Sequence, residues 1–187
     1  MPRHLITAYV ASLLTVGGCA STTTSQLIPS PQSPICQSST KALILWIPQW
    51  RPDQKDVPAR EAAAADGLGQ FFMNSGCFAS ASLQRLPGNS KEVIQDAVAA
   101  ARARNEKVVL IALRELGPTV KIGASLVLVE GGTEVVLDLT EYEPANSAPR
   151  NFTVQWRSGG PGVVKGVATL PQDIQEALAA GLQPRPR

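Results

Sequence analysis

Two short apolar runs constrain the fold of this chain more than any other feature of its sequence. KALILWI occupies residues 41–47 and KVVLIAL occupies residues 107–113. Each run is continuously apolar after its lysine, where a strand with one wet face would alternate apolar and polar residues. Strands that read this way are covered on both faces, as in parallel sheets flanked by helices. The sequence therefore predicts an α/β fold in which both runs are buried strands.

The stretch between these runs predicts two helices and a third strand. Pro58 stands at a suitable first helical position, and apolar residues follow it at helical spacing. A weaker strand is predicted over residues 78–86. A second helix follows, with Asn89 or Ser90 as its cap. Residues 41–113 thus predict the order β-α-β-α-β.

Two glycines fall inside the first predicted helix, at Gly67 and Gly69. A glycine in a helix interior costs roughly 1 kcal/mol relative to alanine. Close packing of the helix against a neighbouring element is a physical reason to keep such residues, and we expect it here.

The second half of the chain predicts a β meander and a closing helix. Residues 120–130 and 133–142 flank Gly131 and Gly132, a two-residue hairpin signal. Pairing Val129 with Glu134 across that turn defines one core face. This face comprises Leu126, Leu128, Val135, Leu137 and Leu139.

A further strand and a last helix complete the predicted domain. Phe152, Val154 and Trp156 alternate as in a strand, and Pro171 opens the helix. The complete order is β-α-β-α-β-β-β-β-α. It predicts a single α/β (α+β) domain of three layers or fewer, with one mixed sheet and helices mainly on one face.

The N-terminus reads as a targeting segment. Residues 1–18 combine a short basic start with the apolar run LITAYVASLLTV, the pattern of a signal peptide. The run is shorter than the roughly 20 apolar residues of a transmembrane helix. Val16, Gly17, Gly18 and Cys19 resemble the lipobox of bacterial lipoproteins. That resemblance implies cleavage before Cys19 and attachment of acyl chains to this residue; a cleaved protein without lipid stays open as the alternative.

The residues after Cys19 predict a location and a tether. Ala20, in place of Asp, favours the outer membrane by the same resemblance, with the protein on its periplasmic face. Residues 19–40 are rich in Ser, Thr, Pro and Gln, which predicts a flexible tether with an extended reach on the order of 50 Å. The folded domain is expected over residues 41–182, followed by a disordered tail at 183–187.

Composition excludes several kinds of chemistry. The chain has one histidine, His4, which leaves with the signal peptide. The mature chain then lacks the imidazole of Ser-His-Asp and Cys-His catalysis and of histidine-ligated zinc. The formal net charge of +2, with 17% charged residues, does not describe a nucleic-acid binder. We expect no enzyme activity, no cofactor and no metal.

Two cysteines remain for the folded domain. Cys36 and Cys77 would face the oxidising periplasm, where thiols pair by default. The predicted first helix runs antiparallel to the predicted first strand, so its end returns to the edge where that strand begins. A disulfide there would stabilise the fold by roughly 3 to 4 kcal/mol in the chain-entropy model. Two buried free thiols are the alternative.

The remaining candidates are charged and aromatic side chains. Five carboxylates gather on the predicted hairpin, and we expect most of them on its solvent face. They are Glu130, Glu134, Asp138, Glu141 and Glu143.

One loop is a candidate binding surface. Ligands in open α/β sheets bind beyond the carboxyl ends of the strands. Trp50 and Arg51 follow the first predicted strand, and Arg85 and Arg114 follow the next two, so these four residues are expected to converge. Trp50 as a lid on the core, with solvated arginines, is the other interpretation. Trp156 is either a core residue or an exposed aromatic at a subunit contact.

The lipobox, the tether and the element order together resemble a group of small periplasmic lipoproteins with a TolB N-terminal-like α/β domain. The group includes the curli-channel periplasmic domain, the peptidoglycan-synthase activators and the Pel export lipoprotein. The resemblance covers about residues 41–182 and rests on element order and stretches such as KALILWIPQW. It implies a non-enzymatic accessory or scaffold in cell-envelope assembly or export, with an envelope protein or polymer, or a second copy, as partner.

Two other functions stay open. One is a ligand-binding or glycan-binding lipoprotein, which needs a concave pocket at the Trp50 edge. The other is a carboxylate-dependent glycan hydrolase, which needs two buried carboxyls facing each other within roughly 5 to 10 Å. Among the resembling proteins, the short tether disfavours a peptidoglycan-synthase activator, which must reach through the cell wall.

Overall fold

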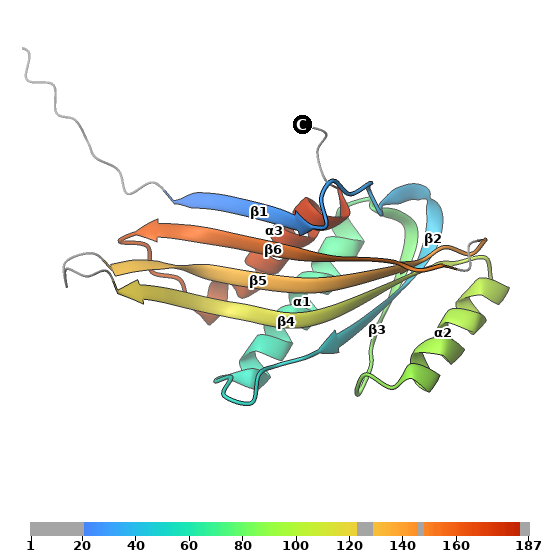
Figure 1. Ribbon diagram of the computed structural model, residues 1–187, viewed down its shortest axis with the longest axis horizontal. Coiled ribbons are helices and arrows are strands. Elements are labelled where there is room, and N and C mark those ends of the chain that lie inside the picture. Colours follow the sequence, from blue (N-terminus) through green and yellow to red (C-terminus); the bar gives the residue numbers. More distant parts are fainter. Residues whose placement is uncertain (1–20, 123–128, 146–147, 184–187) are drawn as a thin grey trace, which may run out of the picture.

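The computed structural model describes residues 21–122, 129–145 and 148–183 (Figure 1). Its elements follow one another along the chain as six strands, three α-helices and one 3₁₀ turn within the described residues. They are β1 (Thr22–Ile28), β2 (Gln37–Pro48), α1 (Val57–Asn74), β3 (Phe78–Arg85), α2 (Lys91–Ala103), β4 (Lys107–Ile122), β5 (Val129–Tyr142), β6 (Arg150–Pro161), η1 (Val167–Thr169) and α3 (Leu170–Leu182).

The six strands form one mixed sheet in the order β1-β6-β5-β4-β2-β3. Strand β2 is parallel to both β3 and β4, while β4, β5, β6 and β1 pair antiparallel. The predicted mixed α/β sheet is confirmed. The segments predicted as separate strands near 107–113 and 120–130 are partly one long strand, β4, with a bulge between Leu113 and Glu115.

Helices cover both faces of the sheet, unequally. Helices α1 and α3 lie together behind the sheet in Figure 1 and bury the larger core, while α2 covers the β2 and β4 end of the other face. Alternate residues of β2 enter each core: Ile44 and Trp46 pack towards α1, and Leu43 and Leu45 towards α2. This two-sided burial explains the continuous apolar run of residues 41–47.

The starts of α1 and α2 follow the expected signals. Helix α1 has proline in its first turn, and α2 begins after Ser90, whose Oγ accepts a hydrogen bond from the Val93 amide. The Ser90 hydroxyl also donates to Glu92, which lowers the pKa of this exposed carboxyl. Gly67 packs closely on α3, since a Cβ there would lie 2.1 Å from Cγ2 of Ile174. Among the described residues, Gly69 has no such neighbour within 4 Å.

The predicted tether over residues 19–40 is wrong for residues 37–40, which begin β2, and for Thr22–Ile28, which form strand β1. The strand pairs antiparallel with β6, with Thr22 opposite Gly159 and Ile28 opposite Thr153. Leu27 packs against the larger core, while the other side chains of β1 are exposed. Such a polar edge strand has no hydrophobic alternation in its sequence, because its pairing partner rather than burial places it in the sheet.

The predicted hairpin turn at Gly131 and Gly132 is also wrong. Both glycines lie inside β5, opposite Val120 and Thr119 of β4, and neither has a positive φ. A Cβ on Gly131 would lie 1.9 Å from the carbonyl oxygen of Val163, so this glycine allows close approach of another segment. Strands β4 and β5 are joined through residues 123–128, which lie outside the described residues, as do Leu126 and Leu128.

The expected core face is otherwise confirmed at three positions, because Val135, Leu137 and Leu139 are buried. Cys36 and Cys77 form the predicted disulfide, with their Cα atoms 4.6 Å apart. Cys19, the signal segment 1–18 and most of the tail 183–187 lie outside the described residues. Among the described helices, none has the length and hydropathy needed to cross a membrane.

Candidate functional site

The loop after β2 is held against the sheet by its backbone and by Trp50. The Gln49 amide donates to the carbonyl oxygen of Leu113 at 2.8 Å, which continues the β2–β4 ladder by one residue. Trp50 is partly buried against the larger core, and its Nε1 donates to Oε1 of Glu61 at 3.2 Å. This placement agrees with a lid on the core.

Glu61 of α1 joins Trp50 to Arg85. Its second oxygen, Oε2, lies 2.8 Å from the guanidinium of Arg85 at the end of β3. The same guanidinium lies over the ring of Trp46, 5.6 Å from the ring centre. The sheet edge therefore brings Trp50 and Arg85 together, but through one carboxylate that occupies both of them.

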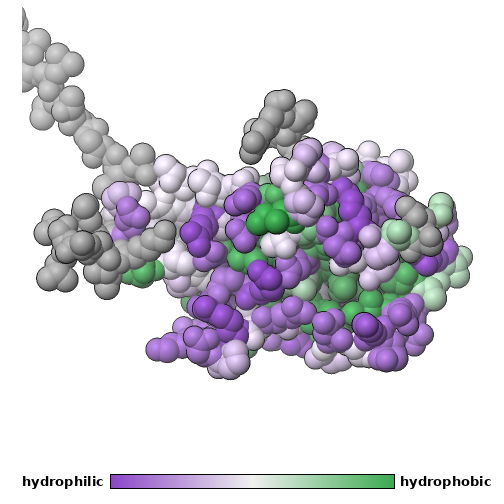
Figure 2. All heavy atoms as spheres, viewed as in Figure 1, coloured by the Kyte–Doolittle hydropathy of each residue, from purple (hydrophilic) through white to green (hydrophobic). Residues whose placement is uncertain are grey.

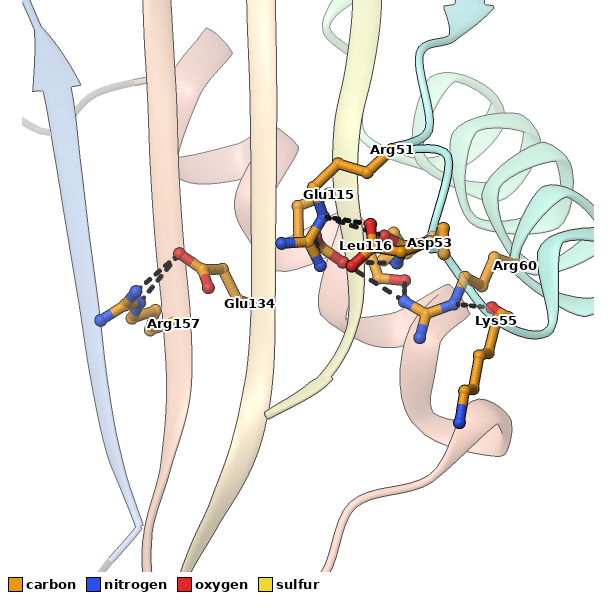
Figure 3. A network of polar contacts seen from close by, with 9 residues as sticks. Arg51, Asp53, Lys55, Arg60, Glu115, Leu116, Glu134 and Arg157 are labelled. Carbon is orange, nitrogen blue, oxygen red and sulfur yellow. Dashed lines mark hydrogen bonds and ion pairs between the residues drawn. The ribbon is translucent and has the colours of Figure 1, made fainter. Parts of the chain in front are cut away.

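A second carboxylate, that of Glu115, contacts other side chains of this loop (Figure 3). Arg51 approaches it from the loop at 3.3 Å, and Arg60 approaches it from α1 at 3.3 Å. Gln54 donates to the same carboxylate at 2.8 Å. Arg60 also donates to the carbonyl oxygens of Lys55 and Leu116. Since Arg60 is buried and Arg51 is exposed, the first is a structural link and the second is available to solvent.

Gly117 makes room for the Arg60 guanidinium. A Cβ at this position would lie 1.6 Å from Nη1 of Arg60. A side chain there would push the guanidinium away from its buried carbonyl partner. Sequence reasoning missed Arg60, because one arginine in a helix gives no signal of burial.

Two of the predicted surface residues lie elsewhere. Arg114 sits at the β4 bulge and pairs at 3.3 Å with Asp138 of β5, apart from Trp50, Arg51 and Arg85. Trp156 is 1% exposed and belongs to the larger core, so its interpretation as an exposed subunit contact is wrong. The Lys165 ammonium lies over its ring, 5.5 Å from the ring centre.

We expected most carboxylates of the β4–β5 region to lie on the solvent face, but several of them are held in ion pairs. Glu141 is buried and lies 2.7 Å from Lys107 and 2.6 Å from Arg150. Glu143 shares the same lysine at 2.7 Å. Glu134 pairs with Arg157 at 2.7 Å. These contacts neutralise the carboxylates in place, which suits a structural role better than acid–base chemistry.

The face of the sheet opposite α1 and α3 carries a polar array, here called the polar sheet face. It includes Thr24, Gln26, Glu134, Gln155 and Arg157, which alternate with core residues along β1, β5 and β6. Hydrophilic residues gather over this part of the surface in Figure 2, and apolar residues show towards α2. Among the described helices, none covers this stretch of the sheet in Figure 1.

Two hollows lie at the opposite end of the sheet from the start of β1. An apolar one of about 220 Å³ lies between α2 and Tyr142. A larger polar one, of about 480 Å³, lies at the amino ends of β2 and β4, and we call it the polar hollow. Its lining includes Ser39, Thr40, Lys41, Arg104, Asn105 and Glu143. Within the described ranges, no group of three or more acidic, histidine or cysteine side chains is placed to hold a metal ion.

Comparison with known proteins locates no family for the chain. No protein-family model and no curated protein matches it. Among solved structures, the PelC dodecamer from Paraburkholderia phytofirmans is 18% identical, with 88% of this chain and 100% of that chain covered and a TM-score of 0.48. A hemagglutinin homolog from Helicobacter pylori is 14% identical (83% and 82% covered, TM-score 0.37). Protein XCC0632 from Xanthomonas campestris is 14% identical (80% and 83%, TM-score 0.38). Likenesses of this size carry no argument about function.

Proposed function

We propose that this chain is a lipid-anchored protein of the outer membrane, held at the periplasmic face through Cys19. Its role is that of a non-enzymatic accessory or scaffold in cell-envelope assembly or export. The partner is an envelope protein or polymer that docks on the folded domain, without a cofactor or metal.

One observation carries this proposal, the disulfide between Cys36 and Cys77. Disulfides persist in oxidising compartments such as the bacterial periplasm. The sequence holds three cysteines, so pairing of these two leaves Cys19 as the single remaining thiol. That thiol follows Val16, Gly17 and Gly18, at the position where the lipobox resemblance requires the acylated residue.

The start of the fold supports action next to the membrane. Strand β1 begins at Thr22, so Ala20 and Ser21 are the residues between Cys19 and the sheet. A domain held this closely extends into the periplasm by no more than its own length. This argues further against a peptidoglycan-synthase activator, which must reach through the cell wall.

The polar sheet face supports a binding role. It offers hydroxyl, amide and charged groups from neighbouring strands, such as Gln26 opposite Gln155 and Glu134 opposite Arg157. The Glu134–Arg157 pair balances charge, so the face suits a polar partner of low net charge. A second copy of the chain is another candidate partner, because within the described residues no further strand pairs with the outer edge of β1 or of β3.

Lipidation is tested by mass spectrometry of the mature protein from bacterial membranes. The expected result is an acylated N-terminal Cys19, and the Cys19→Ser variant should leave the membrane fraction. The matched control is the double variant Cys36→Ser with Cys77→Ser, which should keep the lipid. An unmodified Cys19 in the wild-type protein would rule out the anchor.

The assembly role is tested by mild crosslinking in native membranes, followed by capture of the anchored protein. We expect a crosslinked envelope partner whose yield falls when Gln155→Asp and Gln26→Asp are combined on the polar sheet face. Thr40→Asp, outside that face, is the control. A strictly monomeric protein without any envelope partner would contradict the assembly role.

The polar hollow favours one other function, glycan binding. Its hydroxyl, amide and ammonium groups are of the kind that bind sugar hydroxyls. Titration with peptidoglycan-derived oligosaccharides, followed by NMR, distinguishes the two functions. Saturable shifts confined to residues 39–41 and 104–105 would favour glycan binding over the scaffold role.

A further inference from the structure

The distance between the anchor and the sheet restricts how the domain sits on the membrane. Thr22, the first residue of β1, is three positions after Cys19. A fully extended chain spans about 3.3 to 3.6 Å per residue, so the two Cα atoms are at most about 11 Å apart. Once Cys19 carries lipid, the start of β1 stays close to the bilayer surface.

Several strand ends meet at the start of β1. Thr22 lies opposite Gly159 of β6, Gly160 lies opposite Gly131 of β5, and Gly131 lies opposite Val120 of β4. The start of β1, the end of β6, the start of β5 and the end of β4 therefore form one end of the sheet, on the left in Figure 1. Helix α2 lies at the other end.

Two exposed valines lie at this same end. Val120 is 66% exposed and Val164 is 95% exposed. Both valines are neighbours of Gly131. Val120 is its partner in the sheet. The backbone of Val163 and Val164 packs on Gly131, since a Cβ on this glycine would lie 1.9 Å from the carbonyl oxygen of Val163 and 3.8 Å from Cα of Val164. Moving such exposed valine side chains out of water lowers the free energy.

The charges near these valines are compatible with a lipid surface. Arg157 is paired with Glu134, and Lys165 is paired with Asp173 at 2.6 Å. Glu130 is exposed at the same end. Exposed apolar side chains beside Arg157 and Lys165, whose charges are paired, suit the interfacial region of a bilayer better than bulk water.

We propose that this end of the sheet, defined by Thr22, Val120, Gly131, Gly159 and Val164, rests on the bilayer and places Val120 and Val164 in contact with lipid. The placement rests on the proposed acylation of Cys19. In this placement the strands run from the membrane surface into the periplasm. The polar hollow then opens roughly 40 Å from the lipid, since β5 spans most of that length at about 3.3 Å per residue.

The test uses single cysteines labelled with an environment-sensitive fluorophore in the full-length, acylated protein. Because Cys36 and Cys77 are paired and Cys19 is acylated, an introduced cysteine is the one free thiol. The variants are Val120→Cys, Val164→Cys and, as matched control, Val93→Cys, an exposed valine in the first turn of α2. Each is reconstituted in phosphatidylethanolamine–phosphatidylglycerol vesicles that contain a nitroxide-headgroup lipid.

We expect quenching and a blue shift at positions 120 and 164 that exceed those at position 93 several-fold. A second substitution removes the apolar contact without moving the label: Val164→Asp should reduce the quenching of a label at Val120→Cys. Equal quenching at 93 and 164, or none at 164 in protein with acylated Cys19, overturns the placement alone. Absence of acyl mass on Cys19 overturns the proposed function and the placement with it.

Discussion

Nζ of Lys107 lies 2.7 Å from Oε1 of Glu141, and neither side chain is more than 5% exposed. The same ammonium lies 2.7 Å from Glu143 and donates to the carbonyl oxygen of Ile35 at 3.2 Å. Arg150 completes the cluster on the second oxygen of Glu141. One buried lysine thus joins the segment before β2 to the start of β4 and the end of β5.

Replacing this lysine tests how strongly the cluster supports the fold. Lys107→Met should lower the free energy of unfolding by about 3 to 5 kcal/mol, because it leaves a buried carboxylate with one partner fewer. Retention of Arg150 favours the lower end of that range. Arg104→Ala, which removes an exposed pair with Glu106, should cost less than about 1 kcal/mol. Urea unfolding measures both, and equal costs would contradict the buried role of Lys107.

The two glycines of α1 provide a matched pair. Gly67→Ala places a Cβ against Ile174 and the backbone of Pro171, and it should destabilise the protein by about 1 to 3 kcal/mol through overpacking. Gly69→Ala meets no neighbour within 4 Å and should stabilise the helix by up to about 1 kcal/mol. Thermal unfolding should show opposite shifts in Tm. Shifts of the same sign would refute the close α1–α3 contact at Gly67.

The two arginines that share Glu115 differ in burial, with side chains 10% exposed for Arg60 and 64% for Arg51. Arg60→Ala should cost about 2 to 4 kcal/mol, because it leaves the Leu116 carbonyl and the Glu115 carboxylate without a buried donor. Arg51→Ala should cost about 1 kcal/mol or less. Denaturant midpoints compare them, and a larger loss for Arg51 would be inconsistent with this division of roles.

Substitutions at two neighbouring positions distinguish a paired strand at residues 22–28 from a flexible tether. Leu27→Asp places a charge against the larger core and should destabilise the protein by about 2 kcal/mol or more. Gln26→Asp changes an exposed side chain on the other face and should have an effect within about 0.5 kcal/mol. Hydrogen exchange of the β6 amides and urea unfolding provide the readout. A neutral Leu27→Asp variant would restore the tether interpretation for residues 22–28.

Parts of the candidate site were visible in the sequence, and parts were not. Trp50, Arg51 and Arg85 meet at one edge because consecutive parallel strands end on the same side, a rule that needs only the order of elements. Their contacts with Glu61 and Glu115 depend on the directions in which these side chains of α1 and β4 point. Arg114 does not lie with them, because the β4 bulge changes the register at that residue.

The sequence alone determined the α/β class and the two buried strands of residues 41–47 and 107–113, because continuous apolar runs carry this information locally. It predicted the pairing of Cys36 with Cys77 from the oxidising compartment, with two free thiols as the alternative, and the structure decided between them. Only the tertiary structure decided that Thr22–Ile28 is a strand, that Gly131 lies inside β5, and that Lys107 is buried. In each case the determining partner is distant in sequence, as Thr22 is from Gly159. Pairing and ion contacts of that kind depend on the assembled sheet, so local patterns do not encode them.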